Sequence, residues 1–332
     1  VKAICYAEVT DPDGTTGRLK AMSDGWCTTV GRSARDIAQH IERDGVDILV
    51  DLAGHTKGNR LDVFALSPAP VQITWLGYPG STGLGAMDCR LTDAIADPDG
   101  VSDPYFSEDL IRLPRGFHCY KPPSDCPQVT NLPARETGAI TFGSFNNLGK
   151  VTAEVISAWA RILTEVPGSR MVIKSPKHIE DMRARCRQAF SEHGIDEDRL
   201  ELLADAPTTR EHLENYARID IALDTFPYNG TTTTCEAMWM GVPVVTLRAD
   251  RTAGRIGASL LTEVGMPHLI ADTVDAYVAK ARDLAGKLDH LDTLRASMRQ
   301  RLAASPLCDA AGFARDMEAT YRRLWRRWCD KP

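Results

Sequence analysis

The chain has 332 residues, enough for two domains of ordinary size, and its 43% hydrophobic and 25% charged residues are typical of a globular protein. A formal net charge of −6 gives no reason to expect general binding to nucleic acid, and no apolar run approaches the roughly 20 residues that a membrane-spanning helix needs. Nine scattered cysteines, with no pair in CxxC spacing, favour reduced thiols in the cytoplasm over a disulfide framework or a zinc site.

Strands and helices alternate in the N-terminal domain, which we place at residues 1–120. We expect strands over residues 2–7, 46–52, 71–75, 88–92 and 109–113, and helices over residues 33–44 and 61–66. An α/β unit rarely begins at the second residue of a mature chain. We therefore expect this domain to be incomplete, with further sequence upstream of Val1.

Two loops follow predicted strands of this domain, at the positions where open α/β sheets bind their ligands. The loop at residues 53–60 carries two titratable side chains, His55 and Lys57, between glycines. A solvated loop with a capping histidine is the alternative interpretation. The loop at residues 76–83 begins with Leu76 and Gly77 and holds three glycines, which suggests a close approach of its backbone to another group.

A linker and a second α/β series follow. Residues 121–138 contain four prolines and little periodicity, which indicates an interdomain linker. The second domain is predicted at residues 139–308 and a C-terminal helix at residues 309–332. The expected strands are 140–145, 170–174, 200–203, 219–223, 244–247 and 269–271, and the expected helices begin at 152 and span 178–193, 210–217, 255–264, 274–284, 291–302 and 310–329. Such alternation predicts a parallel sheet in each half.

Residues 219–241 combine a buried strand, a glycine-containing turn and a short helix with a threonine-rich start. The first N–H groups of a helix have no internal partner, and the helix dipole is positive there, so Thr231, Thr232 and Thr233 can surround a diphosphate. Glu236 lies about one turn further on, where a carboxylate can accept both hydroxyls of a ribose. The stretch therefore predicts a nucleotide-diphosphate site with a ribose contact, and the alternative is only a threonine-rich helix cap.

Lys150 follows the first strand of the second domain, at the edge where the threonines also lie. A lysine there can neutralise a departing diphosphate, which glycosyl transfer requires when no metal is present. No Asp-x-Asp element suited to a metal–diphosphate bridge stands at a predicted strand end, and the nearest spellings, at residues 11–13 and 97–99, fall in turns. His212, on a neighbouring predicted helix, can stack on a nucleobase or be structural. Together these features predict a metal-independent nucleotide-sugar transferase with two Rossmann-like domains, a cleft between them and no cofactor.

Three ordered motifs resemble the catalytic region of the O-linked N-acetylglucosamine transferase/SPINDLY family: GHTKGNRLDVFALSPAPVQITWLGYPGSTG, TFGSFNNLGK and LDTFPYNGTTTTCEAMWMGVPVVT. The resemblance covers essentially the whole chain. It implies the α/β GT-B fold, in which two Rossmann-like domains face a cleft, and an inverting, metal-independent transfer of N-acetylglucosamine from UDP-GlcNAc to Ser/Thr of proteins. It also implies an array of tetratricopeptide repeats upstream, which recruits protein substrates.

The resemblance also implies roles for single residues. It assigns turnover to Lys150, the active site to Lys57, and donor binding to Asn147 (beside the phosphates), Thr232 and Thr233 (diphosphate), Glu236 (ribose), His212 (uracil), and Leu76 and Gly77 (sugar pocket). From the residues themselves we add His55 as a catalytic candidate and Thr231 as a donor-binding one. Thr209 replaces a lysine that contacts the ribose, and Asn215 replaces an arginine near the base. The motif wording is nearer to the SPINDLY type, which uses GDP-fucose, so a protein O-fucosyltransferase is one alternative. A donor-binding scaffold without turnover is another, because the family's histidine-bearing loop precedes Val1.

Overall fold

The computed structural model describes residues 1–174 and 180–331, which form two compact units. The first unit contains residues 1–92, 99–117 and the chain from residue 314 on, and the second contains residues 93–98 and 118–313. The proline-rich segment at 121–138 thus groups with the second unit, and most of the last helix groups with the first. Each unit is built around its own parallel strands, as the alternating pattern predicted.

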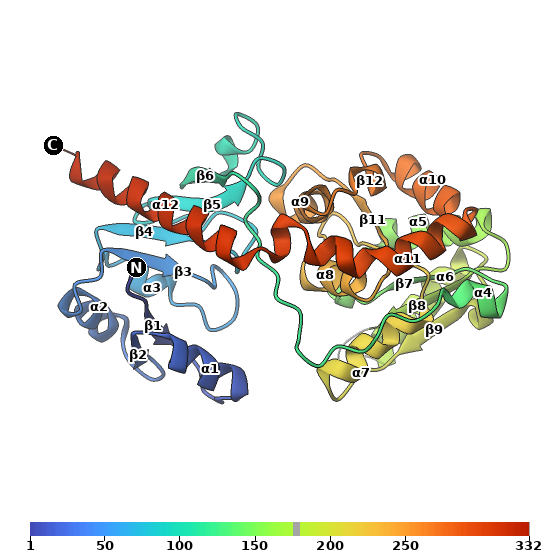
Figure 1. Cartoon of the computed structure of the whole chain (residues 1–332), viewed down its shortest axis with the longest axis horizontal. Coiled ribbons are helices and arrows are strands. Elements are labelled where there is room, and N and C mark those ends of the chain that lie inside the picture. The colour runs from blue at the N-terminus through green and yellow to red at the C-terminus, as the bar shows by residue number, and fades with distance from the viewer. Residues whose placement is uncertain (175–179, 332) are drawn as a thin grey trace. The chain divides into compact units, whose positions relative to one another are not determined.

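The first unit has two sheets (Figure 1). A two-stranded parallel sheet pairs β1 with β2, and a four-stranded sheet has the order β3-β4-β5-β6, in which β3, β4 and β5 run parallel. The elements are β1 (Ile4–Ala7), α1 (Gly14–Met22), β2 (Gly25–Thr28), α2 (Ala34–Arg43), β3 (Ile48–Asp51), α3 (Leu61–Phe64), β4 (Val71–Thr74), β5 (Cys89–Asp93), β6 (Asp109–Leu113) and α12 (Ala310–Cys329), which begins in the second unit.

Two elements of this unit, α1 and β2, were missed in the sequence. None of the residues of α1 is buried, so the helix has no apolar periodicity to reveal it. A capping box holds its start instead: the amide of Thr16 donates to Asp13 Oδ1 at 2.7 Å, and Thr16 Oγ1 accepts from the Asp13 amide. The sequence therefore specifies this helix by its N-terminal capping box and not by an apolar face.

The second unit contains a six-stranded sheet in the order β12-β11-β10-β7-β8-β9, with every neighbouring pair parallel. Its strands are β7 (Thr141–Ser144), β8 (Arg170–Lys174), β9 (Leu200–Leu203), β10 (Ile221–Leu223), β11 (Val244–Leu247) and β12 (Ile270–Ala271), and its helices are α4 (Pro133–Thr137), α5 (Ala153–Glu165), α6 (Glu180–Glu192), α7 (Thr209–Glu214), α8 (Thr232–Trp239), α9 (Ile256–Glu263), α10 (Val274–Ala285) and α11 (Leu288–Ala303). The chain leaves β7 toward β9 on one side and returns to β10 on the other, so the strand order reverses between β7 and β10.

The predicted strands and helices of this unit are confirmed with small shifts at their ends. The first two residues of the helix predicted at 178–193 lie outside the described residues, and α6 is described from Glu180. Helix α4 was missed because it lies in the proline-rich segment, where Pro133 occupies its first turn and Gly138 ends it in the left-handed conformation.

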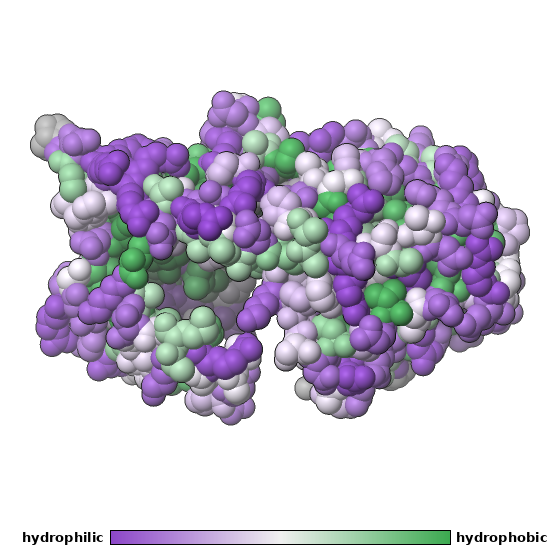
Figure 2. Space-filling view, viewed as in Figure 1, coloured by the Kyte–Doolittle hydropathy of each residue, from purple (hydrophilic) through white to green (hydrophobic). Residues whose placement is uncertain are grey.

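The core of the second unit lies between this sheet and its helices. Trp159 of α5 is fully buried, and its indole N–H donates to the hydroxyl of Tyr277 at 3.0 Å. At the surface, many hydrophilic residues lie along α12 in Figure 2. Arg322, Arg323 and Arg326 of this helix are exposed. Within the described residues, no helix is long and apolar enough to cross a membrane.

The core packing predicts that replacing two leucines of the second unit by alanine will lower the free energy of unfolding by different amounts. Leu163 of α5 is 1% exposed, whereas Leu288 at the start of α11 is 37% exposed. We expect Leu163→Ala to lower the free energy of unfolding by about 2–5 kcal/mol, because it leaves a cavity in the core, and Leu288→Ala to lower it by only about 0.5 kcal/mol. Urea unfolding followed by circular dichroism measures both, and equal losses would contradict the assigned core.

Candidate functional site

The carboxyl ends of β7 and β10 lie side by side at the reversal of strand order in the second unit. In open parallel sheets this switch point is where ligands bind, because the two chains leave it in opposite directions and open a crevice. Lys150 follows β7, and the turn at residues 224–231 follows β10 and leads directly into α8. The sheet topology thus brings two of the sequence-predicted features to one place.

Lys150 reaches the turn that precedes α8. Its Nζ donates to the backbone oxygen of Asn229 at 2.7 Å and lies 3.8 Å from the centre of the Tyr228 ring. Burial lowers the pKa of Lys150, and the carboxylate of Asp224 acts in the opposite direction. An ammonium has three N–H donors, and Asn229 takes one of them. The positive charge and the other two N–H donors of Lys150 therefore lie beside Asn229, close to the start of α8.

Asp224, which the sequence did not single out, organises this turn. Its side chain is 1% exposed, and Oδ1 accepts the amides of Gly230 at 2.7 Å and Thr225 at 2.9 Å. Oδ2 accepts the hydroxyl of Thr246 on β11 at 2.8 Å. Desolvation by burial raises the pKa of Asp224 to about 6, although these hydrogen bonds and the charge of Lys150 act against the rise.

Gly230 allows the turn to pack against the start of α8. A Cβ atom at this position would lie 2.5 Å from Thr233 Oγ1 and 2.7 Å from Asn146 Oδ1, closer than real contacts allow. Thr233 Oγ1 itself donates to Asn146 Oδ1 at 2.8 Å. The glycine predicted from turn chemistry is therefore required by close approach to side chains.

The threonines at the start of α8 have different environments. Thr231 is the N-cap residue but its side chain makes no capping hydrogen bond, and Thr232 is exposed. Thr233 is half-buried and bonded to Asn146, whereas Thr234 is buried. The first three N–H groups of a helix have no partner within it. The start of α8 therefore combines amides that have no partner within the helix, a positive dipole end and the side chains of Thr231 and Thr232, which is the composition of an anion site.

Glu236 and His212 contact each other. Glu236 Oε2 lies 2.9 Å from His212 Nε2, and Lys174 Nζ lies 2.7 Å from His212 Nδ1. A lysine ammonium only donates, so Nδ1 accepts and Nε2 carries the proton that is shared with Glu236. The hydroxyl of Tyr216 also points to Glu236 Oε2, at 3.5 Å, and donates to the backbone oxygen of Thr233 at 3.2 Å.

Lys174 is a site residue that the sequence did not reveal. It is the last residue of β8 and is 4% exposed, and its ammonium also lies 3.4 Å from Asp205 Oδ1. In a sequence, a lysine at the end of an apolar strand is ordinarily interpreted as a solvent-exposed residue that marks the end of the strand. The signal that the sequence offered was its position at the end of a predicted strand.

Asn147 lies between β7 and Lys150, and its Oδ1 accepts the amide of Gly149 at 2.8 Å. Asn147 is itself exposed. The second unit therefore brings together, at one edge of its sheet, Lys150, Asn147, Thr231, Thr232, Thr233, Glu236 and His212.

The other four predicted residues lie in the first unit, on two neighbouring loops that follow β3 and β4. His55 Nε2 lies 2.9 Å from the backbone oxygen of Thr82, and its ring meets Tyr78 edge-on at 5.2 Å between centroids. Lys57 is exposed. Leu76 is 43% exposed and has a φ of 71°, and a Cβ on Gly77 would lie 2.0 Å from the backbone oxygen of Leu52. Gly77 is thus required where the two loops touch.

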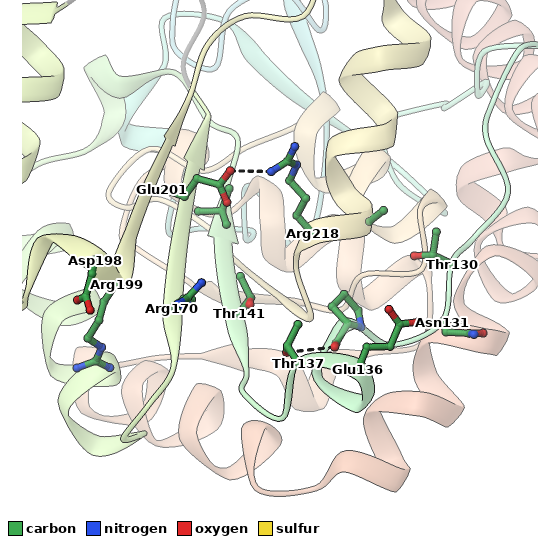
Figure 3. Close-up of a pocket in the computed structure, with 13 residues that line it drawn as sticks. Thr130, Asn131, Glu136, Thr137, Thr141, Arg170, Asp198, Arg199, Glu201 and Arg218 are labelled. Carbon is green, nitrogen blue, oxygen red and sulfur yellow. Dashed lines mark hydrogen bonds and ion pairs between the residues drawn. The ribbon is translucent and has the colours of Figure 1, made fainter.

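A separate cavity of about 450 Å³ lies at the opposite edge of the sheet in the second unit (Figure 3). Thr141 and Arg170, the first residues of β7 and β8, line it, together with Glu201 and Arg218, whose side chains form an ion pair at 2.6 Å. Because these residues lie at the amino ends of the strands, the cavity is not part of the candidate site.

The described residues also contain no cluster of three or more His, Cys, Asp or Glu side chains arranged to hold a metal ion.

Comparisons with known proteins agree on one family. The model of glycosyl transferase family 41 matches residues 1–121 and 127–317. The chain is 43% identical over 334 residues to a tomato (Solanum lycopersicum) protein named probable UDP-N-acetylglucosamine–peptide N-acetylglucosaminyltransferase SPINDLY, covering 99% of this chain and 36% of that protein. It is 30% identical to the SEC protein of Arabidopsis thaliana, named for the same activity, covering 99% of this chain and 34% of that one. The chain therefore spans about a third of the length of these relatives.

Solved structures give the same result. A mutant of the Thermobaculum terrenum O-GlcNAc transferase superposes with a TM-score of 0.93 at 38% identity, covering 99% of this chain and 62% of that one. The Anabaena protein HepE, solved with UDP and glucose, superposes with a TM-score of 0.57 at 14% identity, covering 94% of this chain and 90% of that one, and shares the fold alone.

The raised pKa of Asp224 predicts a pH-dependent stability. The folded state binds this proton more tightly than the unfolded state, so the contribution of Asp224 to the free energy of unfolding is full below about pH 4 and is lost as pH rises through about 6. Between about pH 5 and pH 7.5, we expect wild type to lose about 1 kcal/mol relative to Asp224→Asn. Urea unfolding at both pH values measures the difference.

Asp283→Asn is the matched control, because Asp283 is exposed and pairs with Arg282 at the surface. Its difference from wild type should not change over this pH range. If Asp224→Asn behaves in the same way, the carboxyl group does not titrate as its burial requires.

Proposed function

The chain belongs to glycosyl transferase family 41 and has the GT-B fold, and from this premise we propose that it moves N-acetylglucosamine from UDP-GlcNAc to serine and threonine residues of proteins. The names of the SPINDLY and SEC relatives support this choice of donor and acceptor. Because the chain spans about a third of their length, the activity of the whole protein and the recruitment of acceptors by upstream repeats are parts of the proposal.

One observation carries the proposal: the ammonium of Lys150 lies beside the turn that starts α8, at the switch point of the sheet. When the bond between the sugar and the diphosphate breaks, the leaving UDP gains negative charge. A lysine and the positive end of a helix, both fixed before the reaction, stabilise that charge more in the transition state than in the bound donor. The proposed transfer is metal-independent because these groups supply the neutralisation.

The remaining residues of the second unit fit the other parts of a nucleotide. In the proposal, the hydroxyls of Thr231 and Thr232 and the NH₂ group of Asn147 donate to the phosphates. Glu236 engages His212 through Oε2, so Oε1 is the oxygen assigned to the ribose hydroxyls. His212 is assigned to the base, and Lys174 holds its ring by donating a hydrogen bond to Nδ1.

The residues of the first unit are assigned to the sugar and the acceptor. Leu76 and Gly77 form part of the sugar pocket in this proposal, and His55 and Lys57 are the catalytic residues of the unit. An acceptor hydroxyl attacks the anomeric carbon from the face opposite to the leaving diphosphate. A single displacement of this kind inverts the configuration of the sugar.

Replacement of Lys150 tests the charge-stabilising role. We expect Lys150→Ala to lower the rate of sugar transfer, to a peptide or to water, by about 10²–10³-fold, the usual effect of removing one preorganised donor. Lys287→Ala is the control, because Lys287 is an exposed lysine of the same unit. Unchanged transfer by Lys150→Ala, with a normal circular dichroism spectrum, would remove Lys150 from the mechanism.

Nucleotide binding tests the choice of donor. Titration calorimetry with UDP, GDP and their sugars should show binding of UDP and UDP-GlcNAc, weakened by Glu236→Ala because the ribose contact is lost. Binding of GDP and GDP-fucose alone would replace the proposal by a protein O-fucosyltransferase. Binding of UDP-GlcNAc without any turnover would favour a donor-binding scaffold.

A further inference from the structure

The loop at residues 76–83 in the first unit is held by two buried groups of opposite charge. Arg90, which is 1% exposed, donates from Nη1 to the backbone oxygens of Tyr78 at 2.7 Å and Gly80 at 3.1 Å. Glu108, which is 4% exposed, accepts the amide of Thr82 on Oε1 at 2.6 Å and the hydroxyl of Ser81 on Oε2 at 2.8 Å. The hydroxyl of Thr82 also donates to Glu108 Oε1.

The Glu108 carboxylate is charged when it makes these contacts. Burial would raise the pKa of Glu108, but the hydrogen bonds from Thr82 and Ser81 outweigh burial and lower it below its ordinary value. Three donors from two consecutive residues thus converge on one buried anion. Hydrogen bonds to charged acceptors are about twice as strong as neutral ones, so the amide and hydroxyl of Thr82 and the hydroxyl of Ser81 are firmly held. The peptide group that carries the Thr82 carbonyl is tied to them, because its Gly83 amide donates to Ser81 Oγ at 3.0 Å.

The orientation of Thr82 decides which nitrogen of His55 carries the proton. The backbone oxygen of Thr82 lies 2.9 Å from His55 Nε2, and a carbonyl oxygen can only accept a hydrogen bond. Nε2 is therefore protonated in every state that keeps this contact. In the neutral ring Nδ1 then bears the lone pair, and it is the nitrogen that gains or loses a proton.

We propose that Glu108 is a positioning residue: through Thr82 it fixes the neutral ring of His55 in the Nε2–H form, so that Nδ1 accepts the proton of the acceptor hydroxyl. This inference rests on the proposed function. In the step, the O–H proton moves to Nδ1 and gives an imidazolium ion. The oxygen forms a bond to the anomeric carbon, and the bond from that carbon to the diphosphate oxygen breaks, with its electron pair leaving on the nucleotide.

The first readout is spectroscopic and does not depend on turnover. In ¹⁵N-labelled protein the chemical shifts of Nδ1 and Nε2 distinguish a protonated ring nitrogen from a bare one, and His55→Gln identifies the signals. We expect the neutral ring of wild type to show only the Nε2–H form. Glu108→Ala should show both tautomers in exchange, because the three donors lose their acceptor and Thr82 can turn.

Matched variants separate positioning from general damage. Glu108→Gln should retain the single tautomer, because its carboxamide oxygen can still accept both bonds from Thr82 and the hydroxyl of Ser81 can accept from the NH₂ group. Asp109→Asn should behave as wild type, since Asp109 is the neighbouring exposed carboxylate and pairs with Arg327 at the surface. If Glu108→Ala does not fold, Thr82→Val replaces it and should show the second tautomer in part.

The second readout is kinetic. Glu108→Ala should lower kcat by about 10–100-fold with the KM for the donor unchanged, because loss of a correctly protonated base affects the chemical step and not donor binding. A single Nε2–H tautomer in both Glu108→Ala and Thr82→Val would overturn the inference, as would an unchanged kcat. If wild type binds no nucleotide in calorimetry, the proposed function fails, while the tautomer measurement still decides the role of Glu108.

Discussion

The buried carboxylate of Asp224 is the interaction on which the candidate nucleotide site depends. It ties the end of β10 to Thr246 of β11 and to the amide of Gly230, immediately before α8. A buried charge is costly unless it is fully hydrogen-bonded, so the turn cannot move without leaving this group unpaired. The same charge opposes the effect of burial on the pKa of Lys150. One side chain thus fixes the start of a helix and helps to keep a half-buried lysine charged.

The first unit uses buried charge in a similar way. Its loop at residues 76–83 presents exposed or half-buried groups, but Arg90 holds two of its carbonyl oxygens and Glu108 holds three of its donors. The exposed groups are those with assigned chemistry, and the buried groups determine their orientation. This division allows a loop to present exposed groups to a ligand without losing a defined geometry.

Most of the fold could be predicted from the sequence, because the periodicity of hydrophobic residues identifies apolar strands and amphipathic helices. The strands of both main sheets and most helices of the second unit were found in this way. The elements that escaped are β2, α1 and α4. The two helices are specified by caps and by proline, and none of the residues of α1 is buried. The order of strands in the sheets could not be read from the sequence, since pairing joins residues far apart in the chain.

The sequence by itself determined which loops follow strand ends, and so it identified Lys150, His55 and the threonines of α8 as candidates. It could not identify Lys174, Asp224, Arg90 or Glu108, because each of these residues gains its significance from a distant partner. Lys174 and His212 are 38 residues apart, and Thr82 and Glu108 are 26 apart. Local pattern sets secondary structure over a few residues, whereas the pairing of polar groups is decided only when tertiary packing removes them from water and requires each to find a partner.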